Sequence, residues 1–385
     1  MISTMNAGLM AAVVVVVTVA MTPTSAHAQA TQIFPNGYSV TGVRQADNAG
    51  NLYITGGTGT SPFLYYGPLP SSTNPGGTYT ANLTPVINGT AVTGKSTFYG
   101  PNSSYYDPSI GAGNVRAVGT YLATSTSTYQ DGVMYLGPLT GGTSSSNWTS
   151  LKVPDNVAGI NKQVGDTVPH STMGNLVVGN FNTQTSNQGQ AFIYNINDGI
   201  YSKLSFGEVT SAFGIWQNGG SSSTQYTIVG GYTAIAGGSA SASEGQVGYI
   251  VNYDDSTKAF TNFTDLNFNN DNTVFTHIEG IAAYGSGFSL AAMSVRDAAL
   301  GASYGFVPVT SNGFGTPTWQ AITTGTSPYA TGDTVIDQSV MGLYEPSSGV
   351  TASFVATVPE PSACALLAIG MAALGLTRQG RRRAS

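Results

Sequence analysis

The chain has 385 residues, with 12 basic and 18 acidic side chains and a formal net charge of −6. Four of the arginines lie in the last eight residues, so residues 29–358 hold eight basic and 17 acidic side chains, a net charge of 8 − 17, or −9. So acidic a segment neutralises few phosphates, and nucleic acid is therefore excluded as an expected partner. The single cysteine is Cys364, so stability has to come from core burial and not from disulfides.

The N-terminus carries the pattern of a secretory signal peptide. Residues 9–21 are an almost unbroken apolar run, and Ala26-His27-Ala28 follows as a small-x-small site. This order predicts a signal peptide over residues 1–28, cut between Ala28 and Gln29. An N-terminal membrane anchor is the alternative, but the run is shorter than the roughly 20 residues that a span needs. No Lys or Arg precedes the run, which departs from the usual pattern.

The C-terminus has three parts in a fixed order. Val358-Pro359-Glu360-Pro361 is followed by an apolar stretch at 363–376 and then by a basic end. The basic residues are Arg378, Arg381, Arg382 and Arg383. A stretch of 14 residues is short for a membrane span, but its place before a basic end predicts a transmembrane helix with the arginines on the cytoplasmic side.

This tail resembles the PEP-CTERM sorting signal of Gram-negative bacteria. The resemblance covers residues 358–385 and implies that exosortase, a membrane enzyme, processes the tail in bacteria that make extracellular polysaccharide. It implies that Pro359, Glu360 and Pro361 are recognised, that the inner membrane holds the chain before processing, and that the body ends at the cell surface or in the extracellular matrix. It says nothing of residues 29–357, because such tails occur on many unrelated domains.

The body contains a weak repeat. Four apolar-Gly-x-aromatic tetrads mark it, at residues 118–121, 178–181, 229–232 and 341–344, and looser equivalents lie at 53–56 and 289–292. Further short apolar segments precede and follow each mark. Only 8% of residues are charged, while 21 Tyr and 15 Phe are present, which favours short β-strands joined by tight polar turns over disorder.

Short strands repeating about every 55 residues are typical of propeller blades. We expect an all-β body over residues 29–357, a β-propeller of about six four-stranded blades, with five or seven blades and a tandem β-sandwich or jelly roll as alternatives. The last unit lacks a strand, and the segment Ile33–Val43 is expected to supply it and close the ring.

Two histidines of the body, His170 and His277, fall on strands expected to lie innermost in their blades. In a propeller such strands line the central channel, so the two are expected to converge there. Glu279 and Asp166 lie near them in sequence. A site of two His and a carboxylate is chemically able to hold a metal ion, but the spacing is not diagnostic and ordinary hydrogen-bonded histidines are commoner. We expect a polar channel site without metal or cofactor.

One loop resembles a calcium-binding loop in part. Asp265, Asn267, Asn269 and Asp271 place oxygen ligands at alternate positions, but the glycine at position six and the glutamate at position twelve are missing. A polar turn between blades explains the pattern as well.

The sequence gives little support for a catalytic function. The single cysteine, Cys364, lies in the sorting tail and so offers the body no thiol nucleophile. Some six-bladed propellers are sialidases, with an arginine triad and Ser-x-Asp-x-Gly-x-Thr-Trp turns. The three arginines of the body are Arg44, Arg116 and Arg296, and the nearest turn, at 311–319, lacks the aspartate and has an extra residue.

Tyrosines are expected in loops rich in Ser, Gly and Asn, where aromatic faces suit carbohydrate or protein contact; blade packing is the alternative. These tyrosines are Tyr65, Tyr66, Tyr99, Tyr105, Tyr106 and Tyr129. Two function classes stay open. The first, favoured one is a non-catalytic surface or matrix protein that binds exopolysaccharide or protein. The second is a secreted glycoside hydrolase, which needs two facing carboxylates.

Overall fold

The computed structural model describes residues 28–159, 161–233, 247–296, 299–325, 327, 329–346 and 349–359, with only the backbone of Arg296. The predicted signal peptide up to residue 27 and the sorting tail from Glu360 onward, with its membrane segment, lie outside these residues. Within them, no helix has the length and apolar character needed to cross a membrane.

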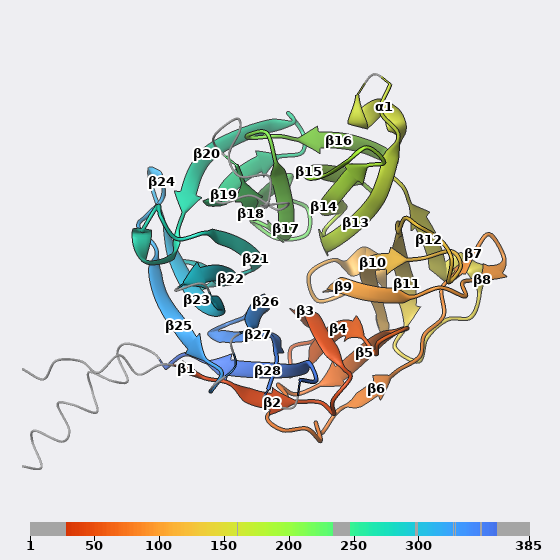
Figure 1. The fold of residues 1–385 in the computed structure, drawn as a ribbon, viewed down its shortest axis with the longest axis horizontal. Helices are drawn as coiled ribbons and strands as arrows, with labels where there is room; N and C mark the ends of the chain where they lie inside the picture. Colours follow the sequence, from red (N-terminus) through yellow and green to blue (C-terminus); the bar gives the residue numbers. More distant parts are fainter. Residues whose placement is uncertain are drawn as a thin grey trace, which may run out of the picture.

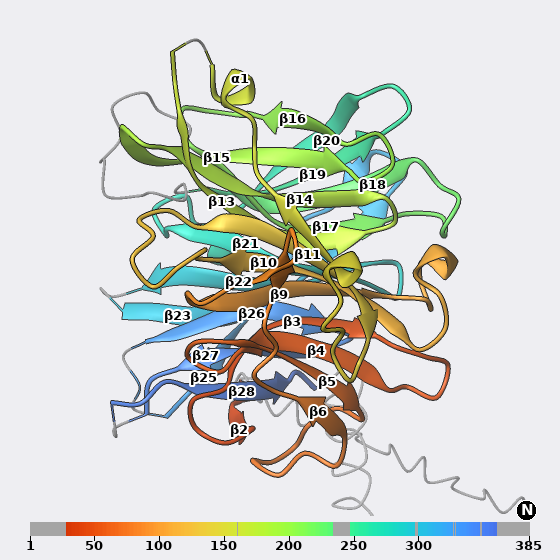
Figure 2. The same ribbon diagram turned by 90° about the vertical axis from the view of Figure 1, so that its right-hand side faces the viewer.

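The described strands form a six-bladed β-propeller, which confirms the predicted fold class and blade number. Six sheets surround a central axis (Figure 1), and their strands run along that axis when the molecule is turned to its side (Figure 2). The four main strands of each sheet are antiparallel, and most of them follow one another in the chain.

From the axis outward, blades 1 to 3 contain these strands: β3 (Ser39–Gln45), β4 (Leu52–Gly57), β5 (Pro62–Gly67) and β6 (Thr78–Thr80); β9 (Ser96–Ser103), β10 (Asn114–Tyr121), β11 (Asp131–Pro138) and β12 (Trp148–Leu151); β13 (Val164–Met173), β14 (Leu176–Thr183), β15 (Ser186–Asn195) and β16 (Ile200–Leu204).

Blades 4 to 6 contain these: β17 (Thr210–Gln217), β18 (Gln225–Tyr232), β19 (Val247–Asp254) and β20 (Ala259–Leu266); β21 (Thr276–Tyr284), β22 (Gly287–Arg296), β23 (Ala299–Thr310) and β25 (Thr318–Thr323); β26 (Ala330–Ile336), β27 (Ser339–Tyr344), β28 (Ala352–Thr357) and β2 (Thr31–Ile33). Short elements complete the set: β1 (Ala28–Gln29), β7 (Val86–Ile87), β8 (Thr90–Ala91), β24 (Gly313–Phe314), α1 (Asp155–Ala158), and the 3₁₀ turns η1 (Pro108–Ile110), η2 (Ser145–Asn147) and η3 (Phe268–Asn270).

The start of the chain closes the ring. β2 pairs antiparallel with β28 as the outer strand of blade 6, and β1 pairs parallel with β25 as a fifth strand of blade 5. The predicted closing segment Ile33–Val43 was therefore wrong in its bounds, because only Ile33 belongs to the closing strand and Ser39–Gln45 is already the inner strand of blade 1. Ser353 on β28 of blade 6 joins this blade to blade 1. Its hydroxyl donates to the Tyr38 carbonyl at 2.6 Å and accepts from the Val40 amide at 2.9 Å.

Burial falls from the axis to the rim. All six residues of β4 are buried, because a second strand is covered by a neighbouring blade on each face. In β20, the outer strand of blade 4, only Leu266 is fully buried. The core consists of apolar clusters between adjacent blades, such as the one that joins Val178 and Ile193 of blade 3 to Ile215 and Ile228 of blade 4. Such packing covers the sheet faces and leaves only the outer strands as edges.

Every inner strand carries a β-bulge at the same level. In each pairing of inner and second strand the register shifts by one residue, so that one inner-strand residue has no partner opposite. The bulged residues are Thr41, Tyr99, His170, Phe213, Glu279 and Asp333. A bulge bends its strand and turns the extra side chain away from the regular pleat, so each blade directs one side chain to the axis.

The repeat marks found in the sequence lie opposite these bulges. In five blades a glycine of the second strand pairs with the residue before the bulge, and Ala292 takes this place in blade 5. These glycines are Gly56, Gly119, Gly179, Gly230 and Gly342. A Cβ at Gly230 would lie 1.9 Å from the carbonyl oxygen of Ser211, and the same kind of clash, at 1.8–2.3 Å, exists at the other four. The glycine thus leaves room for the carbonyl that the bulge pushes toward the second strand.

We expect Gly230→Ala to destabilise the protein by about 1–3 kcal/mol, because the new methyl group meets backbone that has no free space to move into. The matched control is Gly76→Ala, since a Cβ at Gly76 meets nothing within 4 Å. Urea unfolding followed by tyrosine and tryptophan fluorescence measures both. Equal midpoints for Gly230→Ala and the wild type would refute this account of the repeat mark.

Candidate functional site

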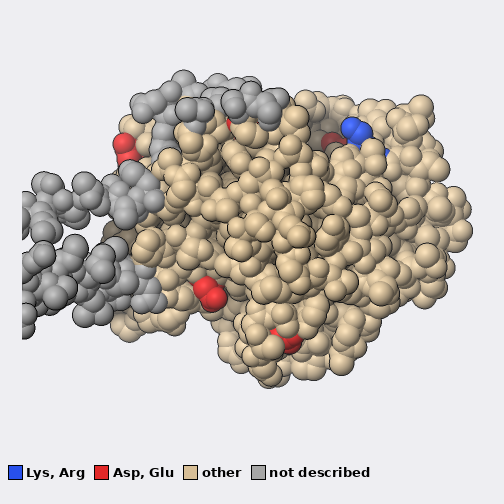
Figure 3. All heavy atoms as spheres, turned by 90° about the horizontal axis from the view of Figure 1, so that it is seen from below, with Lys and Arg blue, Asp and Glu red and all other residues tan. Residues whose placement is uncertain are grey.

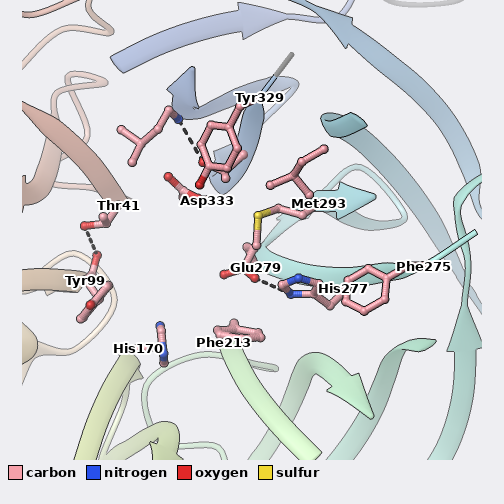
Figure 4. Close-up of a pocket in the computed structure, with 13 residues that line it drawn as sticks. Thr41, Tyr99, His170, Phe213, Phe275, His277, Glu279, Met293, Tyr329 and Asp333 are labelled. Carbon is pink, nitrogen blue, oxygen red and sulfur yellow. Dashed lines mark hydrogen bonds and ion pairs between the residues drawn. The ribbon is translucent and has the colours of Figure 1, made fainter. Parts of the chain in front are cut away.

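The six bulged residues meet at one pocket on the propeller axis. The pocket has a volume of about 440 Å³, and its remaining wall comes from residues before the bulges, from second strands and from Leu300 on the third strand of blade 5. The full lining is Thr41, Tyr99, His170, Phe213, Phe275, His277, Glu279, Met293, Leu300, Tyr329, Thr331, Asp333 and Leu343 (Figure 4). The pocket therefore lies at the end of the channel where the inner strands begin.

Aromatic rings form one side of the pocket. The imidazole of His170 lies between Tyr99 and Phe213, with ring centroids 4.7 Å and 4.6 Å away. Phe213 continues the row to His277, whose ring centroid is 5.4 Å away, and Phe275 packs edge-on against His277 at 5.4 Å. Burial, with a smaller contribution from nearby His277, lowers the pKa of His170 to about 3, so His170 is neutral at ordinary pH and contributes a ring face, not a charge.

Two acidic side chains form the other side. Glu279 on β21 and Asp333 on β26 both point into the open space (Figure 4). Nδ1 of His277 lies 2.6 Å from Oε1 of Glu279, and both side chains are at most 10% exposed. The Oδ2 atom of Asp333 is buried without a hydrogen-bond partner in the described structure. Burial, with a smaller contribution from Glu279, raises the pKa of Asp333 well above its ordinary value.

The far end of the channel is closed by Arg44. Its side chain leaves β3 of blade 1, and Nη2 donates to the Ile215 carbonyl on blade 4 at 3.0 Å and to the Ser171 hydroxyl on blade 3 at 3.4 Å. It therefore crosses the axis, with its guanidinium 5.6 Å from the ring centroid of Trp216. Burial lowers the pKa of Arg44 to about 10, which leaves it charged. Between Arg44 and the bulged residues lies a polar cavity of about 20 Å³, room for one water molecule.

The predicted channel residues are brought together in part. His170, His277 and Glu279 line the pocket. Asp166, the other carboxylate considered beside them, does not: its side chain accepts from the Gln130 amide at 2.8 Å and from the Asn182 side chain at 2.6 Å. Asp166 lies four residues before the bulged residue His170, and its side chain faces the turn at Gln130. Within the described part of the chain, no group of three or more His, Cys, Asp or Glu is arranged to hold a metal ion.

The loop considered for calcium forms a turn with its own hydrogen bonds. Oδ1 of Asp265 accepts from the Tyr232 hydroxyl at 2.8 Å, the Asn267 amide donates to Asn272 at 2.8 Å, and Asp271 accepts from Thr273 at 2.7–2.8 Å. Asn269 lies within η3 with a φ of 56°. Asp265 thus serves blade 4 and Asp271 serves the turn, whereas Oδ1 of Asn267 is buried without a partner in the described structure.

Neither described arginine lies in the pocket lining. Arg44 is used as the channel closure, and Arg116 on β10 pairs with Asp107 at 3.0 Å. The side chain of Arg296 is outside the description. The two arginines with described side chains therefore lie outside the pocket lining, where a sialidase-like arginine triad would have to be.

The placement of the tyrosines in loops was partly wrong. Tyr65 and Tyr66 lie on β5, where Tyr65 is fully buried and donates to the Pro68 carbonyl at 2.7 Å. Tyr99 lies on inner strand β9, at the pocket. Tyr106 packs edge-on against Trp216. Only Tyr105 and Tyr129 of the six are exposed, at 42% and 37%.

Sequence reasoning missed Thr41, Phe213 and Asp333. A signal for most of the ring exists, because four of the bulged residues are followed by glycine, at 42, 100, 214 and 280. A Cβ at Gly42 would lie 1.8 Å from the Tyr99 carbonyl of the next blade, so this glycine lets inner strands approach each other. Asp333 and His170 lack it, being followed by Thr334 and Ser171.

No protein-family model matches the chain, and no curated protein sequence does. Solved structures match at low identity. The sialidase of Trypanosoma rangeli, solved with the inhibitor DANA, shares 9% identity over 85% of this chain and 57% of its own, with a TM-score of 0.48. Hydrazine synthase of Kuenenia stuttgartiensis shares 7% over 74% and 66%, with a TM-score of 0.38. YCF48 of Cyanidioschyzon merolae shares 10% over 87% and 100%, with a TM-score of 0.34.

We expect His170→Phe to remove a pH dependence of stability. The pKa of His170 is about 3 in the folded chain, against an ordinary value of 6.5, so between these values the unfolded chain binds more protons and the wild type loses stability as pH falls. The loss is up to about 1.4 kcal/mol per pH unit. The phenyl ring suits the slot between Tyr99 and Phe213.

Urea unfolding of both proteins at pH 4, 5, 6, 7 and 8 measures this effect. Other titrating groups are common to both chains, so the difference in free energy of unfolding isolates His170. The difference is expected to be constant between pH 7 and 8 and to move in favour of the Phe variant below pH 6. Parallel curves down to pH 4 would show that His170 is not buried as described.

Proposed function

We propose that the chain is an exported protein of the cell surface or extracellular matrix, sorted by exosortase, whose propeller binds extracellular glycan without catalysis. The export half of the proposal is supported by the sequence of both ends. The binding half is supported by the pocket, where the bulges gather aromatic faces and acidic groups on a chain otherwise poor in charge.

The body provides one place from which both terminal segments leave. Ala28 and Val358 belong to the same apolar cluster, and Ala28 and Pro359 line one shallow pocket. This place is at the outer edge of the ring, where β1 lies (Figure 1), whereas the central pocket is on the axis. A tail held in the inner membrane therefore leaves the pocket free for a ligand.

We expect the intact mass of the mature protein to begin at Gln29 and to lack the tail only in cells with an active exosortase. Ala28, which the predicted cut removes, is 2% exposed and pairs with Ile322, so the mass also shows whether this residue is kept. Glu360→Gln is expected to block tail removal, and Glu345→Gln, also between β27 and the chain end, is the matched control. A tail that persists with and without exosortase would refute sorting and leave a membrane-anchored protein.

The single observation that carries the binding proposal is the convergence of six bulged side chains on one pocket. Concave sites with apolar walls and a few directed polar groups are typical of small-ligand sites. Ring faces such as those of Tyr99 and Phe213 pack against the C–H faces of a sugar, while Thr41, Glu279 and Asp333 offer hydrogen bonds to its hydroxyl groups. The volume of about 440 Å³ accommodates one or two sugar units.

A glycoside hydrolase is the second candidate, and one observation favours it. Glu279 and Asp333 form a pair of acidic groups in which the pKa of Asp333 is raised. An acid of raised pKa beside a carboxylate is the arrangement that glycoside hydrolysis uses. Oε1 of Glu279 is engaged by His277 at 2.6 Å, which leaves this carboxylate less available as a base, so we keep binding as the first proposal.

The pocket is tested by calorimetric titration with cellohexaose, dextran and the hexamer of N-acetylglucosamine. We expect at least one to bind, and Phe213→Leu to weaken it about fivefold, since the lost ring face contributes roughly 1 kcal/mol. Phe260→Leu in the same blade is the matched control, because Phe260 lies on outer strand β20 and is 38% exposed. Absence of binding, or equal losses in both variants, would refute the pocket as the glycan site. Release of reducing ends, abolished in Asp333→Asn, would favour the hydrolase.

A further inference from the structure

We propose that the pocket selects a cationic amino sugar, a sugar unit with a free ammonium group, over neutral and anionic sugars. This inference rests on the proposed glycan binding and names the class of sugar. It is carried by the acidic groups of the pocket, by the aromatic row that faces them, and by the absence of Lys and Arg from the pocket lining.

The unsatisfied acidic atom lies where a ligand would reach it. Oδ2 of Asp333 is buried and unpartnered in the described structure, and the side chain points into the pocket (Figure 4). Leaving a buried acceptor without a donor destabilises the folded protein, and more so when the acceptor is charged. The Thr331 side chain interacts with the carboxyl group of Asp333, but no described donor is in hydrogen-bond geometry with Oδ2. A bound cation that donates a hydrogen bond to Oδ2 therefore removes the cost.

The second acidic group makes the same space more negative. Glu279 lines the pocket with Asp333 and is close enough to raise its pKa. The groups facing the pair are Arg44 below the bulges, His170, His277, Tyr99 and Tyr329. Arg44 donates to the Ile215 carbonyl and the Ser171 hydroxyl. Because His277 contacts Glu279, the acidic atom that the described structure leaves for a ligand is Oδ2 of Asp333.

The aromatic row suits the same ligand. Ring faces attract a cation and also pack against a sugar ring, so one wall serves both parts of an amino sugar. His170 adds to this wall as a neutral ring, because burial keeps its pKa near 3. None of the 13 lining residues that the structure describes is Lys or Arg, so these residues offer an anionic sugar no ion pair. A neutral sugar leaves the Asp333 acceptor dependent on a hydroxyl donor, which is weaker than an ammonium group.

The test compares the fully deacetylated hexamer of glucosamine with the hexamer of N-acetylglucosamine at pH 6, by calorimetric titration of the full exported chain. The two probes differ only in ammonium against acetamide. We expect the deacetylated hexamer to bind at least tenfold more tightly. Asp333→Asn and Glu279→Gln, which keep side-chain size, are each expected to reduce this preference below about threefold. Asp198→Asn is the control for general attraction to an acidic protein, because Asp198 is exposed and lies outside the pocket.

A second readout does not depend on affinity alone. If Asp333 is protonated in the free protein, then binding of an ammonium ionises it and releases up to one proton, which titration in buffers of different ionisation enthalpy measures. We expect release in the wild type and in Asp198→Asn but not in Asp333→Asn. Urea unfolding of each variant verifies that it is folded.

The outcomes separate the inference from the function on which it rests. Equal or tighter binding of the acetylated hexamer overturns the amino-sugar inference and leaves glycan binding in place. Binding of neither hexamer, nor of any neutral probe, overturns both. Binding of spermidine as tight as that of the deacetylated hexamer shows a site for amines in general and overturns the sugar part. A preference that survives Asp333→Asn, or that Asp198→Asn abolishes equally, shows that the pocket acids do not select the cation.

Discussion

The central site depends on a contact between two backbones, repeated around the ring. In each blade the inner strand bulges, and in five blades the carbonyl two residues before the bulge lies 1.8–2.3 Å from where a Cβ on the second-strand glycine would be. A glycine at that place lets the bulge form in five blades, and Ala292 takes this place in blade 5. Without the bulge the side chains of the inner strands would keep the regular alternation of the pleat, and no six residues would face the axis at one level.

The bulges let a uniform fold carry a varied site. The backbone is nearly the same in all blades, but the residue at the bulge is a different one in each, from Thr41 to Asp333. None of these six side chains belongs to the apolar clusters that join the blades. The composition of the pocket can therefore change while the propeller stays intact, which is how a repeated scaffold acquires a specific ligand.

Few residues of the protein are charged, and these charged residues are unevenly distributed. The side of the ring seen in Figure 3 carries only a few charged side chains on a surface of polar and apolar groups. At the axis, by contrast, Arg44, Glu279 and Asp333 stand within one channel, although burying charge is costly. Arg44 offsets this cost with hydrogen bonds across the axis to blades 3 and 4. Asp333 does so only in part, since burial raises its pKa and favours the neutral acid. Arg44 is thus better satisfied by hydrogen bonds than Asp333 is, and the acidic side of the pocket has more to gain from a bound donor.

The sequence by itself predicted the all-β class, the repeat and the six blades, because the glycine that makes room for the bulge is visible as a recurring letter between apolar and aromatic neighbours. It also predicted that His170 and His277 converge, since both precede a mark on an inner strand. It misplaced Tyr65 and Tyr99 in loops, because polar neighbours such as Ser103 and Asn102 look like a loop although they are buried in β9. It did not separate closing strand β2 from inner strand β3. Only the tertiary structure decided that Asp333 shares the pocket with Glu279 and that Arg44 closes the channel below. Such meetings between blades far apart in the chain depend on ring closure and on a one-residue register shift, and neither leaves a periodic trace in the sequence.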